Sequence, residues 1–456
     1  MDSEKGKAQD YRSVYTFIFT FFYLFEGIHQ GMVYVYPFLL MKFQEGAYDA
    51  AMIMYISSAT SLPWAFKFIV GAINDKWGSK RLGRRFPFIL GGGGFCAIFW
   101  VVFALKLPEL SYNTPQVYGQ LLFYSIMTNI GMAIADTAID GLILDITTKD
   151  KLGKVQSITW GFLLIGSTFG GAGLGFVFLQ FDLLALFFML TGIFCFIGSV
   201  LTIFVKERVS DSIVLIKGDI RKLFVKKENW KVYSFTLTES ATNPMISLIF
   251  PIAVLVSIGS LNSEETLLIL ASGNIGSLFI DTVVIQIGYG IGVTIGILIA
   301  YRITDRSRSR SVRLGYYFYI PMCFIAIFFK GLILGNIAMG FFGLSYGLIS
   351  VSGQTVRGDI AKQHFKDAKS TFFAILISIS NAGLALGNFL IGLIFQFLAL
   401  RVANFDLLMF LVMCFCALIL IISLVSFNSI NPDYYEFKKN LENIEVIDVN
   451  LKENED

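Results

Sequence analysis

The stretch GAINDKWGSKR, Gly71–Arg81, stands between two long apolar runs, at 51–73 and 87–105. A membrane-spanning helix needs roughly 20 apolar residues to cross a hydrocarbon core about 30 Å thick. Each of the two runs is of that kind, whereas the stretch between them is short, charged and contains glycine. We therefore interpret Gly71–Arg81 as a tight turn at a membrane surface that joins two antiparallel spans.

The composition of the whole chain agrees with a membrane protein. Of its 456 residues, 55% are apolar and only 15% are charged, against about 25% in a soluble globular protein. The mean hydropathy is +0.69. These values argue against a soluble enzyme and against disorder. The net charge of +3 is too small to indicate nucleic acid as a partner.

The cysteines and histidines predict neither disulfides nor a metal site. All five cysteines lie in apolar runs without a CxxC motif, and His29 and His364 are the only histidines. A histidine-based metal site therefore has almost no ligands, and we expect no metal and no cofactor. The first apolar run is too long for a signal peptide, so we expect it to remain as a span.

Twelve apolar runs predict an all-α polytopic membrane protein. In this arrangement the loops on one side of the membrane hold few Lys and Arg residues. This bias predicts a cell-membrane protein with both termini cytoplasmic. The exceptions are Lys67, inside a span, and four residues in outer loops: Lys42, Lys106, Lys330 and Arg401. The predicted spans are 14–40, 51–73, 87–105, 117–146, 156–180, 183–204, 233–258, 282–301, 314–330, 333–356, 371–398 and 405–427.

The longest cytoplasmic segment, 205–232, is basic and divides the spans into six and six. We predict an N-terminal six-helix bundle over 1–204, a linker over 205–232, a C-terminal six-helix bundle over 233–427 and a mobile acidic tail over 428–456. The apolar stretch Thr266–Ile280 is too short for a further span. It is expected to be an interfacial helix or an extension of span eight.

The two halves echo each other, as in many secondary transporters. Asp145-Ile146 ends span four, and Asp359-Ile360 ends span ten. Asp75-Lys76 follows span two, and Asp305-Arg306 follows span eight.

Gly71–Arg81 reads G-x-x-x-D-K-x-G-x-K-R, which resembles the loop signature of the major facilitator superfamily, with a weaker copy at Tyr301–Ser311. The resemblance implies two six-helix bundles, with spans one, four, seven and ten around a central cavity. Ser61–Gly78 and Ala135–Asp145 are similar to muropeptide permeases and acetyl-CoA transporters, and Leu82–Leu90 is similar to folate–biopterin and sugar–cation symporters. Span five has no proline and so lacks the antiporter signature, and no sugar-porter signature follows span four.

The turn after span two suits a gate at the inner membrane surface. Gly71 permits close helix approach and Gly78 a tight turn, while Asp75 can face a helix N-terminus of the opposite half. Arg84 and Arg85 can reach Asp145. The alternative is that the basic residues only set the topology. The predicted gate comprises Gly71, Asp75, Lys76, Gly78, Lys80, Arg81, Arg84, Arg85 and Asp145.

Ionisable side chains inside a bilayer are costly, so they are functional candidates. Spans three, six, nine and twelve hold none of Asp, Glu, Lys or Arg in their interiors. Arg357 and Asp359 close span ten. The candidates for ion coupling or substrate binding are Glu26, His29, Gln30, Asp136, Asp140, Glu239, Asn243 and Gln354.

Glu26 shares one helical face with Tyr23, Gln30 and Tyr34 and lies near the middle of span one. A carboxyl there could exchange a proton as access alternates, with His29 titrating beside it. Three roles stay open for Glu26: proton coupling, substrate contact and structural pairing.

Asp136 and Asp140, four residues apart, share a face of span four. Lys67 lies at a similar depth in span two, so we expect an ion pair with one aspartate and leave the other free for a proton or cation.

In span seven, Pro244 should kink or break the helix near Glu239 and Asn243 and free carbonyls for binding. Secondary candidates are Gln286, Tyr289, Gln354, Ser378 and Asn381.

These features predict a monomeric secondary transporter that moves a small polar or amphiphilic organic solute by alternating access. No GxxxxGK[ST] motif is present, which argues against ATP drive. The buried carboxyls favour protons over sodium as the coupling ion. The alternatives are a membrane-embedded enzyme acting on lipid and a transporter-like receptor that moves nothing.

Overall fold

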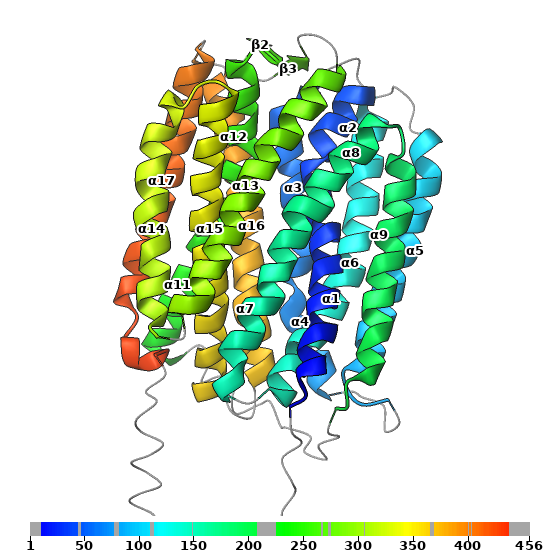
Figure 1. Ribbon diagram of the computed structural model, residues 1–456, viewed down its shortest axis with the longest axis vertical. Coiled ribbons are helices and arrows are strands. Elements are labelled where there is room, and N and C mark those ends of the chain that lie inside the picture. The colour runs from blue at the N-terminus through cyan, green and yellow to red at the C-terminus, as the bar shows by residue number, and fades with distance from the viewer. Residues whose placement is uncertain are drawn as a thin grey trace, which may run out of the picture.

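The computed structural model describes most of the chain as a bundle of long helices that run up and down its long axis (Figure 1). The first and last described residues lie at the same end, which we call the lower face, and the opposite end is the upper face. The described residues are 11–43, 47–76, 82–109, 114–147, 149–207, 225–265, 268–271, 275–304, 306–364, 369–399, 401–402 and 404–436.

The first half contains six helical spans, several of them interrupted. The first span is divided by the short 3-10 helix η1, and the fifth passes through a π-helix, η3. The elements are α1 Ser13–Gly31, η1 Met32–Tyr34, α2 Tyr36–Phe43, α3 Ala50–Ala65, α4 Lys67–Lys76, α5 Phe86–Lys106, α6 Thr114–Ile146, α7 Lys149–Ile165, η3 Gly166–Leu174, α8 Gly175–Gln180 and α9 Leu184–Leu201.

The second half repeats this arrangement. Its first span breaks at Thr242, two residues before Pro244, so the predicted break in span seven is confirmed. The elements are α11 Lys227–Ala241, α12 Asn243–Ser257, α13 Ile275–Ile303, α14 Arg308–Ile325, α15 Leu332–His364, α16 Lys369–Ala399 and α17 Phe405–Ser429.

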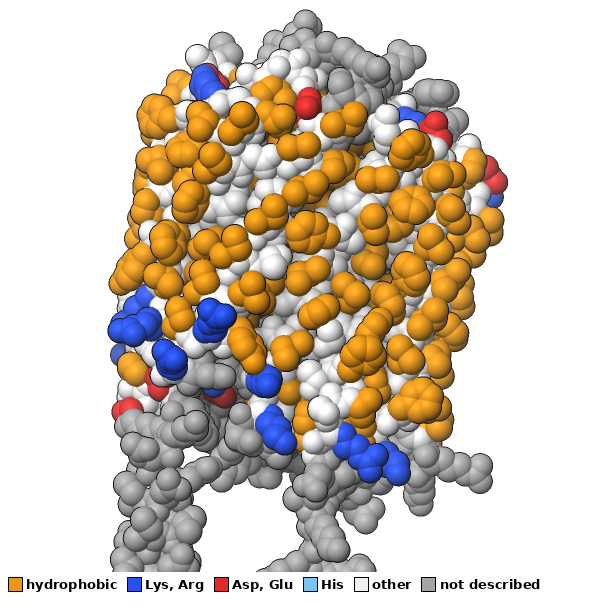
Figure 2. Space-filling view, in the orientation of Figure 1, with side chains coloured by type: hydrophobic (Ala, Val, Ile, Leu, Met, Phe, Trp, Pro, Cys, Tyr) orange, Lys and Arg blue, Asp and Glu red, His pale blue; other side chains and the backbone are white. Residues whose placement is uncertain are grey.

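Among the described residues, 11 helical segments are long and apolar enough to cross a membrane. The remaining predicted span is the first, Ser13–Phe43, whose helices follow one another along the bundle. On the face in Figure 2, hydrophobic side chains cover most of the surface, while Lys and Arg gather toward the lower edge. The predicted all-α fold of twelve spans is therefore confirmed.

A small antiparallel sheet joins the two halves on the upper face. It contains β1 Ala47–Asp49, β2 Leu261–Glu265 and β3 Leu268–Ala271, in the order β1-β3-β2. β1 precedes span two, whereas β2 and β3 precede span eight, and Tyr48 pairs with Ile269. The expected interfacial helix within Thr266–Ile280 is wrong for Leu268–Ala271, which form β3 because they find backbone partners on both sides. The alternative, an extension of span eight, is confirmed for Ile275–Ile280, which begin α13.

Spans one and five approach each other until their backbones touch. A Cβ atom on Gly27 would lie 2.1 Å from the Leu163 carbonyl oxygen, and one on Gly31 would lie 2.2 Å from that of Ser167. Only glycine permits this approach. The wider π-helical turn of Gly166–Leu174 lies at this contact, as π-turns often do near functional sites.

The contact predicts that Gly27→Ala lowers the thermal midpoint of the purified protein. A buried overpacking of this kind costs about 1–3 kcal/mol. Gly91→Ala is the matched control, because a Cβ there meets nothing within 4 Å. Scanning fluorimetry should show destabilisation by the first substitution only, and equal midpoints would contradict the contact.

Candidate functional site

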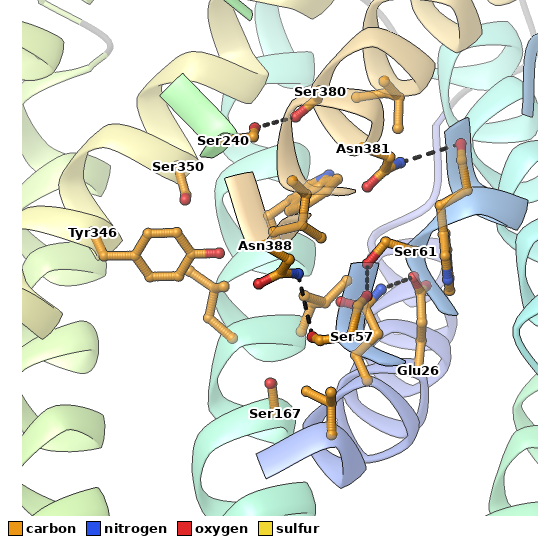
Figure 3. Close-up of a pocket in the computed structure, with 18 of the residues that line it drawn as sticks. Glu26, Ser57, Ser61, Ser167, Ser240, Tyr346, Ser350, Ser380, Asn381 and Asn388 are labelled. Carbon is orange, nitrogen blue, oxygen red and sulfur yellow. Dashed lines mark hydrogen bonds between the residues drawn. The ribbon is translucent and has the colours of Figure 1, made fainter. Parts of the chain in front are cut away.

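A cavity lies between the two halves, with about 1540 Å³ of space not filled by atoms, including its open part. Figure 3 shows Glu26, Ser57 and Ser61 on one side and Tyr346 and Ser350 on the other. Its aromatic wall contains Tyr34, Tyr36, Trp64, Trp160, Tyr289, Tyr319 and Tyr346. Of the predicted site residues it is lined by Glu26, His29, Gln30, Asp136, Glu239 and Gln354, and Lys67 lines it as well.

The first half places a cluster of charged groups at the cavity, which we call the acid cluster: Glu26, Lys67, Asp136 and Asp140. Lys67 is 0% exposed, contacts Asp136, and lies 3.2 Å from Asp140 Oδ2. The expectation that one aspartate would stay free is wrong, because one ammonium group has three donors and reaches both. Asp140 lies behind Lys67 rather than on the cavity wall and accepts a 2.5 Å hydrogen bond from Tyr23 Oη.

The acid cluster holds three carboxyl groups and one ammonium group, so acid is in excess. Glu26 is 1% exposed and accepts a 2.8 Å hydrogen bond from Gln30 Nε2, and it interacts with Asp136 and Lys67. Within the described part of the chain, Glu26 Oε2 and Asp136 Oδ1 have no hydrogen-bond partner. Because unpaired buried charges are costly, the cluster has a place for a proton or cation.

His29 is held in one orientation by Trp100. The Trp100 indole Nε1 donates a 2.9 Å hydrogen bond to His29 Nδ1. Since an indole N–H only donates, Nδ1 must be an acceptor, and the ring hydrogen of a neutral imidazole then lies on Nε2. Nε2 has no partner among the described residues, and His29 lines the cavity. This geometry favours a fixed hydrogen-bond donor over the predicted titration beside Glu26.

The second half contributes one ion pair, between Glu239 of α11 and Arg357 of α15. Sequence reasoning placed Arg357 at the end of span ten, but its side chain is 1% exposed and lines the cavity. Its signal was the spacing of three residues from Gln354, which puts both on one helical face. Asn243 lies at the start of α12, and its side chain is outside the described residues.

Of the secondary candidates, Tyr289 and Asn381 line the cavity, together with Gln354. Ser378 instead joins the halves, because its Oγ accepts a 2.9 Å hydrogen bond from Phe68 N. Gln286 is buried outside the set of residues that line the cavity.

The halves contact each other both above and below the cavity. Toward the upper face, Tyr55 Oη donates to Gln396 Oε1 at 2.7 Å. Toward the lower face, Lys362 Nζ donates to the Thr147 carbonyl at 2.7 Å, and a Cβ on Gly71 would lie 2.9 Å from Ala374 Cβ. The predicted close helix approach at Gly71 is confirmed, and the halves touch each other on both sides of the cavity.

At the lower face of the first half, Asp145 joins Arg84 and Arg85, as predicted. Arg84 Nη2 lies 2.8 Å and Arg85 Nη2 3.2 Å from Asp145 Oδ2. Glu207, which sequence reasoning missed, accepts from Arg84 N at 2.7 Å and Arg85 N at 2.8 Å. Burial raises the pKa of Glu207, whereas these N–H donors and the Arg85 charge oppose that shift.

The second half builds the same cluster. Arg308 Nε lies 2.9 Å from Asp359 Oδ2, and Glu436 accepts from Arg308 N at 3.2 Å and Ser309 N at 2.9 Å. Glu436 thus corresponds to Glu207. Each lies a few residues beyond the last span of its half, which was the available signal. We call the two arrangements the lower-face clusters.

Other members of the predicted gate cannot be placed in these clusters. Asp75 and Lys76 end α4, but their side chains are outside the described residues. Gly78, Lys80 and Arg81 lie outside the described residues altogether.

The beginning of the C-terminal tail packs against the second half. Tyr434 Oη donates to Asn229 Oδ1 at 2.7 Å, and its ring stacks on His364 with centroids 3.8 Å apart. Glu436 belongs to the lower-face cluster described above. The tail therefore has partners in the fold as far as residue 436, while its expected mobility stays a prediction. The rest of the predicted tail, and residues 208–224 of the predicted linker, lie outside the described residues.

Comparison with known proteins identifies the family. A family model described as Major Facilitator Superfamily matches residues 12–364, so the chain belongs to that superfamily and the resemblance is confirmed. The crystal structure of the superfamily transporter FucP in the outward conformation matches with a TM-score of 0.61 and 12% identity. That match covers 91% of this chain and 99% of FucP. It shows a shared fold.

A curated relative matches over a shorter region. The probable folate-biopterin transporter 4 of Arabidopsis thaliana is 24% identical over 142 residues. The match spans 30% of this chain and only 27% of the length of that protein.

The acid cluster predicts a specific pattern of stability. Lys67→Met should lower the thermal midpoint strongly, because breaking a buried ion pair costs about 3–5 kcal/mol. The double variant Lys67→Met/Asp136→Asn should recover part of that loss, since it removes one uncompensated carboxylate. Lys106→Met, at an exposed pair with Glu109, is the control and should leave the midpoint unchanged. A double variant no more stable than the single one would refute the pairing.

The lower-face clusters predict local effects on backbone opening. Glu207→Ala should speed amide exchange at the start of α5, and Glu436→Ala at the start of α14, several-fold each. Loss of a helix cap costs about 1 kcal/mol. Hydrogen exchange with mass spectrometry separates the two sites. If either substitution changed both sites equally, or neither, the proposed correspondence would be wrong.

Proposed function

We propose that this member of the major facilitator superfamily moves a small polar or amphiphilic organic solute across the cell membrane by alternating access, coupled to protons. The observation that carries the proposal is the cavity between two repeated halves, which touch each other above and below it and line it with buried ionisable groups. Such groups persist in a membrane protein where solute or ion must bind. Rocking of the halves would open the upper and lower contacts in turn.

The acid cluster supports protons as the coupling ion. Three carboxyls share one ammonium group, and Glu26 and Asp136 each keep an oxygen without a hydrogen-bond partner among the described residues. A proton on Glu26 would reduce the excess negative charge and give that oxygen a hydrogen to donate. Sodium is the rival ion, and the experiment below separates the two.

The lower face is proposed to be cytoplasmic. Lys and Arg gather there on the face shown in Figure 2, as expected for cytoplasmic loops. We further propose that the protein works as a monomer, because one chain supplies both walls of the cavity.

Transport is proposed in preference to catalysis because several serine hydroxyls of the cavity already have local partners. Ser61 donates to the Ser57 carbonyl at 2.8 Å, and Ser240 contacts Ser380. His29 accepts from Trp100. A serine activated by a neighbouring base, which an acyl-transfer enzyme needs, is not among these described contacts.

Reconstituted vesicles test the proposal. The purified protein is placed in liposomes with a pH gradient, and folates, pterins, glycopeptides and nucleotide thioesters are offered as solutes. Folates and pterins are included because the curated relative is named as a probable folate-biopterin transporter. A transported solute should accumulate with the proton gradient, and a sodium gradient alone should not replace it.

Glu26→Gln is expected to abolish gradient-driven accumulation while leaving solute exchange across the membrane at equilibrium. The amide cannot carry the proton but keeps the shape of the side chain. Glu109→Gln, at an exposed site, is the matched control and should accumulate solute normally. Unchanged accumulation by Glu26→Gln would remove Glu26 from the coupling mechanism.

A further inference from the structure

Arg357 is a buried cation with open hydrogen-bonding capacity in the cavity wall. It is 1% exposed and lies on α15. It contacts Glu239 through Nη2, whereas its Nε has no hydrogen-bond partner within the described part of the chain. A guanidinium group has five N–H donors, and a buried donor without an acceptor is costly. The geometry therefore leaves an acceptor position open beside Arg357.

The surroundings of Arg357 differ from those of Lys67, the other cation that lines the cavity in the described residues. Lys67 contacts two carboxylates, Asp136 and Asp140, within the acid cluster. Arg357 contacts one carboxylate, so the second half presents a positive group that is not surrounded by excess acid. The cavity is thus polarised, with its acid on the first half and an open cationic donor on the second.

We propose that Arg357 binds a carboxylate group of the transported solute, at the position that Glu239 occupies in this structure. The inference rests on the proposed transport function and names the substrate class for the same cavity. The Glu239 carboxylate lies against the guanidinium in this structure, and a carboxylate that can align freely with arginine favours two parallel N–H···O bonds.

The backbone of α15 is shaped to receive a carboxylate at this position. A Cβ on Gly353 would lie only 3.2 Å from Glu239 Oε1, so the glycine accommodates the carboxylate beside α15. Gln354 Oε1, one turn away, also has no partner among the described residues. It can accept a hydrogen bond from the solute.

The wall of the same cavity is rich in aromatic side chains, which favours an aromatic body for the solute. Trp160, Tyr289 and Tyr346 line the cavity together with Arg357. Ring faces favour a planar, conjugated group through stacking. The solute class that fits is therefore an aromatic or heteroaromatic carboxylic acid.

A pair of probes that differ only in charge tests the assignment. 4-Nitrobenzoate and its neutral amide, 4-nitrobenzamide, both quench tryptophan fluorescence, and Trp160 lies in the cavity wall. Binding is measured at equilibrium, at one pH and with no gradient. Glu239→Gln removes the resident carboxylate and should bind the benzoate at least about tenfold more tightly than wild type, and in preference to the amide.

A double variant of the two paired residues serves as the control for correct folding. Arg357→Gln alone would leave Glu239 unpaired, so the test uses Glu239→Gln/Arg357→Gln, whose pair is neutral. This double variant should lose the preference for benzoate over amide to within about twofold, while its thermal midpoint stays close to that of Glu239→Gln. Arg310→Gln, at an exposed site on α14, should leave the preference unchanged.

Several outcomes would overturn the assignment: equal binding of benzoate and amide by Glu239→Gln, no benzoate binding by that variant, or a preference kept by the double variant. Preference for the ammonium analogue 4-nitrobenzylamine would also do so and would assign a cationic solute. Because no gradient is used, a failure of proton coupling leaves this result untouched. Likewise, if Glu239→Gln shows no preference for the charged probe, the result of the transport assay on Glu26→Gln still stands.

Discussion

A buried ammonium group, that of Lys67, is the interaction on which the first half of the protein depends. In a membrane a charge without a partner is costly, so Lys67 must be surrounded by acceptors. It lies at the first residue of α4, where span two resumes after its break. Asp136 and Asp140 of α6 supply the carboxylates, and Tyr23 of α1 donates to Asp140. Three spans therefore share one electrostatic centre, and the cavity lies against it.

The two halves share one charge arrangement and differ in another. At the lower face, Arg84, Asp145 and Glu207 correspond to Arg308, Asp359 and Glu436. In each half, an acidic residue that follows the last span accepts hydrogen bonds from backbone N–H groups at the start of the third span, which is α5 in the first half and α14 in the second. Inside the cavity the described residues of the halves differ, because the first half carries excess acid whereas the second holds a single pair. This asymmetry matches the proposed coupling, since a proton and a solute group need different partners.

Hydropathy and charge placement predicted the twelve spans, and Pro244 predicted the break in span seven, because these signals are local. The pairing of Asp145 with Arg84 and Arg85 also followed from short distances along neighbouring spans. The pairing of β1 with β3 joins residues more than two hundred positions apart, and strand pairing of that range has no local signal. Glu207 and Glu436 looked like solvated acids, because only the folded chain brings them to the helix starts. Arg357 seemed to end its span, since a long side chain can reach deeper than its backbone.

The central claim is that the two halves move against each other around the cavity, so that contacts at one face open as those at the other close. Distances between spin labels measure this motion directly. One pair of labels spans the lower face, at Leu82 and Arg310, and another spans the upper face, at Lys106 and Arg401; all four residues are exposed. Changes of pH and solute should lengthen one distance while shortening the other. Distances that stay fixed, or that change in the same sense at both faces, would contradict the account.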